Sequence, residues 1–509
     1  MTDSSLSPGA RRWLLLAACL TAVLIPLCFT GPAVVLPAIS QALGGSAVEL
    51  GWITNGYILA YGSAMMAAGS LADIHGRKRV WLVGLVLFAG VTLLIPFAPS
   101  VLGFDLLRVL QGLGGSAAFA GAMAALAQEF HGPIRTRVFS LLGTTFGLGL
   151  AFGPLLAGLL SDGLGWRMVF LLPALFGVIG ALLVALCARE SRDPAAQGVD
   201  WPGAVSFTAM LTLFTCGTLL APERGWSHPL VQGLLWGSLV LLVTFVLIER
   251  RVARPMLELG LFRRAQFAGV QLLGASPAFA FVVLIVLLPG RFIGADGLGA
   301  VAVGQLMIAL SGPLLVVPVL AALLSRWFTA GLLSALGLVL NAVGLLWMST
   351  ALADEPQALI GPMLLVGVGI GLPWGLMDGL AVSVVEKERA GMATGIFNTV
   401  RVSGDGVAIA LVGALLSALV LTGLPASGAS PADLVGAAGH AAMGDLAQAA
   451  ALLGVERAAL QPGYDAAFRT LLQVLAAITA ATAVLVFALL GKVRTHEPEA
   501  SVAVSAGQA

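Results

Sequence analysis

Residues 69–79 read Gly-Ser-Leu-Ala-Asp-Ile-His-Gly-Arg-Lys-Arg and lie between two long apolar segments. Gly69 predicts a close contact between helices, and Gly76 predicts a tight turn, since glycine adopts backbone conformations that other residues avoid. Asp73 falls at the end of a predicted helix, where it can bond to nearby cations or to the N-terminus of a neighbouring helix. The cations are Arg77, Lys78 and Arg79. Basic residues alone are typical of any short cytoplasmic loop, but the complete order is more specific and predicts a gating cluster.

The composition of the chain argues against a soluble protein. Of its 509 residues, 59% are hydrophobic and 10% are charged, and the mean hydropathy is +1.00. Soluble proteins usually carry about 25% charged residues, so this chain has too little charge to cover a soluble surface. We therefore expect the apolar surface to face a lipid bilayer. The net charge of +1, without an acidic tail or a basic arm, gives no reason to expect a nucleic-acid partner.

Fourteen apolar segments are long enough to cross the bilayer core as helices, which takes about 20 residues each. The segments are 13–39, 49–72, 80–98, 101–127, 138–161, 168–188, 203–221, 230–249, 267–289, 300–324, 330–350, 358–384, 391–421 and 467–491. The long segment between the last two, 422–466, is expected to be external, with a short amphipathic helix near 445–460. It could act as a lid, but we favour its interpretation as an ornament, that is, an external segment without a role in transport.

The distribution of lysine and arginine predicts the orientation. With the N-terminus inside, 19 of the 26 basic residues fall in cytoplasmic segments, 4 in external segments and 3 within spans, one of these (Arg469) at the external end of its span. This bias follows the positive-inside rule and predicts a multi-pass protein with both termini in the cytoplasm. Scarce lysine with abundant alanine and glycine is typical of a GC-rich bacterium, so we expect a bacterial inner membrane.

Ionisable side chains within spans are the best pointers to function, because each costs about 2.5–3.5 kcal/mol to insert. Asp405 lies near the middle of span 391–421, and Arg401 and Asn398 share its helical face. A carboxylate beside a guanidinium stays ionised, and releasing the pair would let a proton bind, as proton coupling requires. The alternative is a permanent structural ion pair.

Three further charged residues lie within spans. Asp378 follows Gly371 and Gly375 at helical spacing, so we expect it on the side of the helix where small residues pack. It is either a helix–helix bond or a protonatable group in the cleft. Asp105 lies one turn from Arg108 and is expected to pair with it.

Polar and aromatic residues within spans are candidates for the lining of a central substrate cavity. They are Asn55, Tyr57, Tyr61, Gln111, Trp374 and Asn398. A largely apolar cavity with few charges would suit hydrophobic or amphipathic compounds. For Trp374 taken alone, a lipid-facing or packing position is the stronger expectation. The four cysteines lack CxxC spacing and the five histidines are scattered, so the sequence predicts neither a metal site nor a cofactor.

The order of residues 69–79 resembles the signature loop of the major facilitator superfamily. Other stretches resemble further motifs of that family. Arg108-Val-Leu-Gln111-Gly112 is similar to its R-x-x-Q-G motif, whose arginine is often tied to proton relay. Gly143, Gly147, Gly149, Gly153-Pro154 and Gly158 resemble its antiporter motif, which implies a role for the Gly153-Pro154 bend in shape change. The segment 389–401 looks like the penultimate helix of the 14-span drug:proton antiporter branch.

The resemblance implies an all-α membrane protein with the major facilitator fold, in which two six-helix bundles are joined by two linker helices. The expected division is 1–190, 191–260 and 261–509. One departure concerns the first span, where relatives often carry an acidic residue. Residues 27–30 read Leu-Cys-Phe-Thr, so no proton-coupling role can be carried over to this span.

The implied function is multidrug efflux: proton-coupled export of lipophilic or amphipathic small molecules by alternating access, with protons as the coupling ion and the chain acting as a monomer. No G-x-x-x-x-G-K-[ST] motif is present, which argues against ATP as the direct energy source. An alternative is a dedicated exporter of one metabolite or natural product. A more remote alternative is a membrane-embedded transferase, for which the sequence shows neither a clustered His/Cys metal set nor a soluble catalytic domain.

Overall fold

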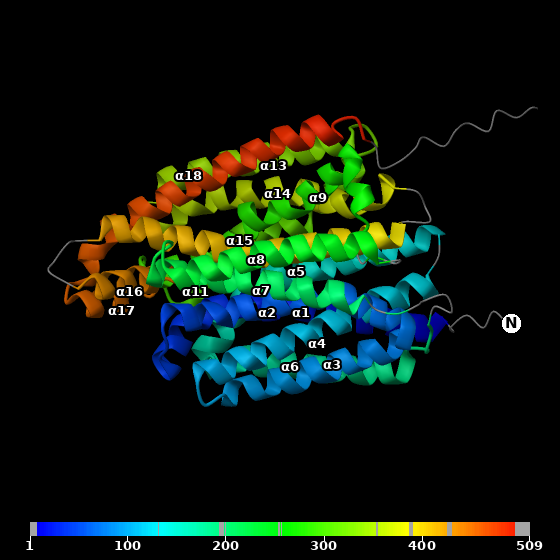
Figure 1. The fold of residues 1–509 in the computed structure, drawn as a ribbon, viewed down its shortest axis with the longest axis horizontal. Coiled ribbons are helices and arrows are strands. Elements are labelled where there is room, and N and C mark those ends of the chain that lie inside the picture. Colours follow the sequence, from blue (N-terminus) through cyan, green and yellow to red (C-terminus); the bar gives the residue numbers. More distant parts are fainter. Residues whose placement is uncertain are drawn as a thin grey trace, which may run out of the picture.

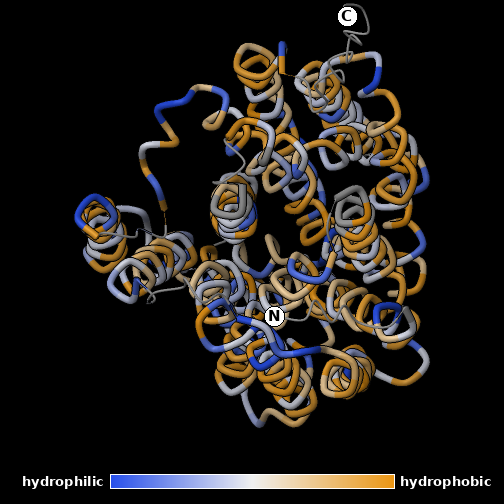
Figure 2. The backbone as a smooth tube through the Cα atoms, turned by 90° about the vertical axis from the view of Figure 1, so that its right-hand side faces the viewer, coloured by the Kyte–Doolittle hydropathy of each residue, from blue (hydrophilic) through white to orange (hydrophobic). Residues whose placement is uncertain are grey.

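A computed structural model describes residues 8–130, 132–192, 198, 200–252, 255, 257–352, 355–385, 390–424 and 430–493. Within these ranges the chain forms long helices that run roughly side by side, and no strand is found among them (Figure 1). Figure 2 looks along the helices and shows that hydrophobic segments dominate, with hydrophilic stretches mostly in the connections. The expectation of an all-helical membrane protein is confirmed.

The N-terminal half and the linker contain eight long helices. Those of the N-terminal half are α1 (Pro8–Leu43), α2 (Ala47–His75), α3 (Arg77–Leu94), α4 (Val101–Glu129), α5 (Gly132–Leu164) and α6 (Met168–Cys187). The linker helices are α7 (Trp201–Arg224) and α8 (Pro229–Arg251). A short 3-10 turn, Ile95–Phe97, precedes α4, and another, Leu259–Arg263, follows α8.

The C-terminal half contains six spans, two of which are interrupted. The first interrupted span runs from α9 (Ala265–Pro277) through a π-helical turn (Ala278–Val282) into α10 (Val283–Gly294). The second interrupted span runs from α11 (Ala300–Ser311) through a 3-10 turn (Gly312–Leu315) into α12 (Val317–Leu324). Prolines at 277, 313 and 318 lie at these interruptions. Because proline has no N–H to continue the helical hydrogen bonds, it explains why the helices are interrupted there. The other four are α13 (Ala330–Ala351), α14 (Ile360–Ser383, after a 3-10 turn, Pro356–Leu359), α15 (Ala390–Gly423) and α18 (Arg457–Leu490).

In the described part of the chain, fourteen long helical segments correspond to the fourteen expected spans. Thirteen of them are long and apolar enough to cross a membrane, with each interrupted span taken as one. The remaining one is α2, which has 29 residues and includes the polar side chains of Glu49, Asn55 and Asp73. At 1.5 Å per residue α2 is about 43 Å long, enough for the roughly 30 Å hydrocarbon core.

The segment 422–466 contains more structure than the sequence predicts. Two helices, α16 (Pro431–Ala442) and α17 (Leu446–Leu453), lie at one end of the bundle, and we call Pro431–Leu453 the insert (Figure 1). The expectation of one short helix near 445–460 was incomplete. The next helix, α18, already begins at Arg457 and not near 467, so it extends well beyond the expected span.

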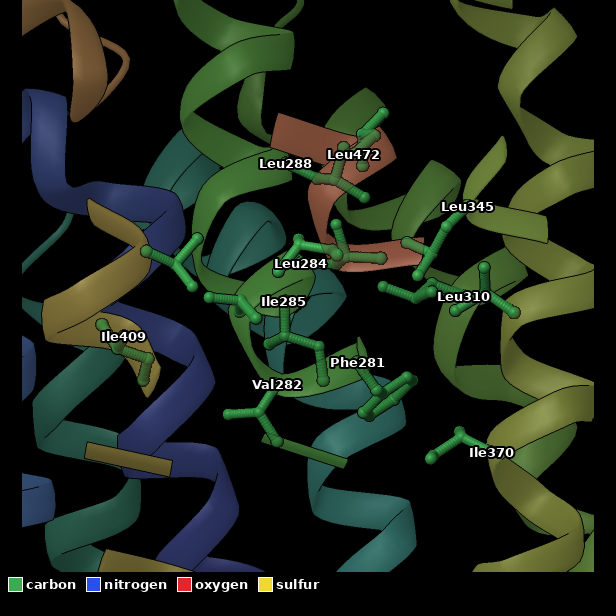
Figure 3. Packing of buried hydrophobic residues seen from close by; sticks show 14 of the residues in the cluster. Phe281, Val282, Leu284, Ile285, Leu288, Leu310, Leu345, Ile370, Ile409 and Leu472 are labelled. Atoms are coloured by element: carbon green, nitrogen blue, oxygen red, sulfur yellow. The ribbon is translucent and has the colours of Figure 1, made fainter. Parts of the chain in front are cut away.

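The core of the C-terminal half surrounds α10. Leu284, Ile285 and Leu288 are fully buried, and they lie among Leu310, Leu345, Ile370 and Leu472 from neighbouring helices (Figure 3). The linker helix α8 is the opposite case, because Trp236 and Val240 are 62% and 63% exposed. Exposed apolar side chains on a spanning helix face lipid at no cost, which is why α8 can stand at the edge of the bundle.

The two halves meet closely near the end of the bundle that carries the insert. A Cβ on Gly158 of α5 would collide with the carbonyl oxygen of Ala300 at the start of α11. About two turns further along α5, Ser311 of α11 donates a hydrogen bond of 3.1 Å to the carbonyl oxygen of Ala151. We call this end the insert end and the opposite one, which carries Gly76, the Gly76 end.

Candidate functional site

The loop at residues 69–79 lies at the Gly76 end, between α2 and α3. Gly76 has φ +114°, which favours glycine, and Asp73 accepts hydrogen bonds from Nε and Nη2 of Arg77 at 3.1 and 2.9 Å. Arg77 also donates to the side chain of Gln128 on α4 at 2.5 Å. The expected close helix contact at Gly69 was wrong: no described atom lies within 4 Å of where its Cβ would be.

Glu190 is a member of this cluster that sequence reasoning missed. Its carboxylate accepts backbone N–H groups of Lys78 and Arg79, both at 3.2 Å, at the N-terminus of α3. The same carboxylate occupies the space that a side chain on residue 76 would need, so Gly76 is required for this approach as well as for the turn. The sequence offered one signal for this role of Glu190: it is an acidic residue shortly after the sixth span, at a membrane face where most charged residues are basic.

Arg108 on α4 is fully buried and held by several groups. Its Nε donates to the carbonyl oxygen of Ile53 at 2.7 Å, its Nη1 donates to Gln111, and its guanidinium lies 4.3 Å from the ring centre of Tyr57. Gln111 in turn donates to the hydroxyl of Thr92 on α3 at 2.7 Å. This network ties α2, α3 and α4 into one unit.

The expected pairing of Asp105 with Arg108 was wrong. The two residues are both described and form no ion pair, because Arg108 turns toward α2 and Gln111. Asp105 is 8% exposed, and its Oδ1 has no hydrogen-bond partner in the described part of the chain. Asn55, also expected near the cavity, is buried and donates to Gly51 within its own helix at 3.0 Å. Both side chains are buried within the packing of the N-terminal helices.

Arg401 on α15 has looser surroundings than Arg108. Its Nη2 donates to Oδ1 of Asn398 at 2.9 Å, and its Nη1 lies 3.7 Å from Oδ1 of Asp378. The guanidinium lies 5.7 Å from the ring centre of Trp374 and 5.6 Å from that of Phe397. Trp374 lies against this charged residue and also packs against Phe281 of the C-terminal core, which is the packing position that was one of the two expected for this residue alone.

Asp378 does not face the side where small residues pack. Gly375, three residues earlier, abuts the backbone of Pro318, whereas the Asp378 side chain is 57% exposed. Each residue of an α-helix is rotated by about 100° from the one before, so residues three apart point about 60° apart and can face different neighbours. Asp378 is instead the ion-pair partner of Arg401.

Asp405 is one helical turn beyond Arg401, but the expected ion pair between them is not formed. Among the described residues Arg401 pairs with Asp378 and Asn398, while Oδ1 of Asp405 is buried and has no hydrogen-bond partner. Tyr61 interacts electrostatically with both Arg401 and Asp405. A carboxylate that lacks a partner in a buried place is the group most ready to bind a proton.

An aromatic pair on α2 lies between the two arginine clusters. The rings of Tyr57 and Tyr61 are stacked, with centres 6.2 Å apart and planes 9° apart. Tyr57 lies against Arg108, and Tyr61 lies near Arg401 and Asp405. Since α2 also packs closely against α15, at Gly62 and Ser403, this pair is where the N-terminal network meets the C-terminal one.

The Gly153-Pro154 bend of α5 packs against α1. A Cβ on Gly153 would collide with the hydroxyl of Thr30, and one on Gly149 would collide with Pro26. Thr30 lies in the stretch where relatives often carry an acidic residue, and its hydroxyl donates to the carbonyl oxygen of Pro26 at 2.9 Å. The first span therefore contributes small-residue packing at this position.

The sequence matches one family model over most of its length. The model is described as the Major Facilitator Superfamily and matches residues 18–409. The chain belongs to the major facilitator superfamily. Among relatives of this major facilitator chain, a cephamycin export protein of Amycolatopsis lactamdurans is 33% identical over 424 residues, which covers 81% of this chain and 85% of that protein. A puromycin resistance protein of Streptomyces alboniger is 30% identical and covers 85% of this chain and 87% of the relative.

Solved structures show the same fold. A bacterial homolog of the human lysosomal transporter Spinster, described as inward-facing and unoccupied, superposes with a TM-score of 0.67. It is 17% identical, and the match covers 97% of this chain and all of that one. The resemblance to the family seen in the sequence is thereby confirmed, and the family comprises transporters and not enzymes.

Proposed function

We propose that this major facilitator chain exports lipophilic or amphipathic small molecules in exchange for protons by alternating access. One observation carries the proposal: Asp405 has a buried carboxylate oxygen without a partner, while the adjacent Arg401 pairs with the half-exposed Asp378. Two carboxylates thus compete for one guanidinium within a membrane-spanning region. The Gly76 end, with its excess of basic residues, would face the cytoplasm of a bacterial inner membrane.

The competition gives a route for coupling. When Arg401 pairs with Asp378, Asp405 loses its cation, and burial then favours the protonated carboxyl. When Arg401 turns back to Asp405, the carboxylate is stabilised in its ionised form and the proton leaves. A proton that moves inward gains about 2.3 kcal/mol per 100 mV of membrane potential, which supplies the energy for export.

The substrate class follows from the surroundings of Arg401 and from the relatives. Trp374 and Phe397 place aromatic rings beside the charged Arg401, and Tyr61 lies close by, a combination that binding sites for small molecules commonly have. Named relatives include a multidrug resistance protein, Stp, of Mycobacterium tuberculosis, 28% identical over 387 residues. These features support compounds with a large apolar part and a polar or charged part.

A second candidate is the export of one natural product. It is favoured by relatives whose names specify single compounds, such as the cephamycin export protein and a probable actinorhodin transporter of Streptomyces coelicolor, 31% identical over 446 residues. A dedicated exporter would use the same coupling residues and differ in substrate range.

The test is transport in inverted membrane vesicles. We would impose a proton gradient, add a panel of fluorescent lipophilic cations and neutral dyes, and compare wild type with Asp405→Asn. The matched control is Glu223→Gln, which makes the same carboxyl-to-amide change at an exposed position on α7. We expect gradient-driven dye movement in wild type and the control and at least a tenfold loss in Asp405→Asn.

Two results would change the proposal. Equal movement in wild type and Asp405→Asn would remove Asp405 from the coupling mechanism and direct attention to Asp378. A wild type that moves none of the dyes but transports one natural product would favour the dedicated exporter.

A further inference from the structure

The insert is firmly seated on the C-terminal half. Gly444, in the turn between α16 and α17, abuts Gly290 and Gly294 of α10 so closely that a side chain on any of the three would collide. A Cβ on Gly290, for instance, would lie 2.8 Å from the carbonyl oxygen of Met443. The insert is also continuous with α15 and α18, so it is bound to this half both through the chain and through backbone packing.

The part of α10 that carries the insert is itself fixed. Arg291, next to Gly290, is 1% exposed, and its Nη1 lies 2.5 Å from Asp465 on α18. Its Nη2 donates to the carbonyl oxygen of Leu352, just beyond α13, at 2.8 Å. The sequence places Arg291 in an external loop because the span is expected to end at 289, but the helix continues to Gly294. These bonds make α10, α13, α18 and the insert one body.

The contacts of the insert with the N-terminal half are fewer and weaker. Ser40, near the end of α1, donates a hydrogen bond of 3.3 Å to Oδ2 of Asp445. A Cβ on Gly439 of α16 would lie 2.9 Å from Cβ of Ala47, the first residue of α2. Met443 packs against the apolar cluster at the insert end of the N-terminal half. Among the described residues, this boundary is crossed by one hydrogen bond at Ser40 and by close apolar approaches at Ala47 and Met443.

Asp445 is oriented toward Ser40 by its capping interaction with α17. Its Oδ1 accepts the backbone N–H of Gln448 at 3.1 Å and caps α17, which leaves Oδ2 to reach across to α1. The nearest titratable side chain is His440, whose Nδ1 lies 4.0 Å from Oδ2. Burial lowers the pKa of His440, so the imidazole is neutral at neutral pH and competes little with Ser40 for the carboxylate.

We infer that the insert is a latch for the insert end: it travels with the C-terminal half and keeps this end shut through Ser40, Ala47 and Met443. Opening of the insert end requires that these contacts separate, while those at Gly290, Gly294 and Gly444 persist. The inference rests on the alternating access in the proposed function, but it does not depend on proton coupling or on the substrate. It also replaces the interpretation of segment 422–466 as an ornament.

A disulfide across the boundary tests the latch. In a background where the four native cysteines are replaced by serine, we would combine Gly439→Cys with Ala47→Cys. Disulfide Cβ atoms lie about 3.5–4.5 Å apart, so a separation of 2.9 Å needs only a small shift. We expect oxidation to form the bridge, to stop transport of the dyes that wild type moves, and to be reversed by dithiothreitol. Each single cysteine variant should transport normally under both conditions.

Two results would overturn the latch: no bridge on oxidation, or full transport by the bridged protein. A second measurement needs no transport and so separates this inference from the proposed function. Ser40→Ala should raise the reaction rate of Ala47→Cys with a membrane-impermeant maleimide about two- to tenfold, as loss of one hydrogen bond implies. Ser161→Ala, on α5 at the same end, is the matched control and should leave the rate unchanged. An unchanged rate in Ser40→Ala would contradict the latch.

Discussion

Two arginines within the membrane-spanning helices, Arg108 and Arg401, have opposite surroundings. Arg108 is completely buried, donates from Nε and Nη1 to two different partners and lies against Tyr57. Among the described residues, Arg401 has one hydrogen bond, one loose ion pair at 3.7 Å and two aromatic neighbours at 5.6 and 5.7 Å, and its side chain is 12% exposed. Although Nη2 of Arg108 has no hydrogen-bond partner among the described residues, this arginine is a brace, because moving it would leave Ile53 and Gln111 without their shared partner. A loosely held one can change partners, so we infer that the moving part lies in α15 and the fixed part in α4.

The first prediction compares the same substitution at both positions. Arg108→Lys removes the planar fork that reaches Ile53 and Gln111 together, and a lysine ammonium cannot replace it. Each buried group left without a partner costs about 1–3 kcal/mol, so we expect a large drop in the thermal unfolding midpoint of the purified protein. Arg401→Lys keeps the charge near Asp378 and Asn398 and should unfold close to the wild-type temperature. Equal midpoints for the two variants would refute the distinction between brace and moving part.

The second prediction concerns transport by the loosely held arginine. Arg401→Gln removes the cation for which Asp378 and Asp405 compete, so we expect at least a tenfold loss of gradient-driven dye transport with an unchanged unfolding midpoint. Arg401→Lys should retain part of the transport. The vesicle assay and thermal unfolding in detergent measure the two quantities separately. Normal transport by Arg401→Gln would show that Asp405 does not need this cation.

The sequence predicts the architecture well because the bilayer imposes simple rules. Helix length, charge bias and small-residue packing follow from hydrocarbon thickness and from the absence of water, and each can be read locally. A row of glycines on α14, for example, packs closely against the backbone or side chains of residues 310–318; its members are Gly367, Gly371 and Gly375. Gly143 is a counterexample, since no described atom lies within 4 Å of where its Cβ would be.

The interaction partners of the buried charged residues could not be predicted from the sequence. Asp405 and Arg401 share a helical face, yet Arg401 pairs with Asp378 on another helix, because the rotation of α14 relative to α15 decides which carboxylate is within reach. The same holds for Asp105 and Arg108. Sequence spacing fixes neighbours within one helix, while ion pairs depend on tertiary packing. The first helix of the insert, α16, was missed for a related reason, since this alanine-rich helix carries a weak signal and is held by contacts with distant residues.

The third prediction extends the comparison to a cluster outside the membrane core. Glu190, with a side chain that is 37% exposed, binds two backbone N–H groups at the start of α3 and lies 3.5 Å from Arg79, which is 77% exposed. Water competes for these exposed charges, and a carboxylate at a helix N-terminus is worth about 0.3–1 kcal/mol.

Glu190→Gln should therefore lower the unfolding midpoint only slightly, much less than Arg108→Lys, and reduce transport less than twofold, with Glu223→Gln as the matched control. The amide can still accept one of the two N–H groups, which limits the loss further. Because Glu190 fills the space beside Gly76, a larger substitution such as Glu190→Trp should be more harmful than the amide. If Glu190→Gln instead lowered the unfolding midpoint as much as Arg108→Lys, the stabilising effect of a charged residue in this fold would not depend on its burial.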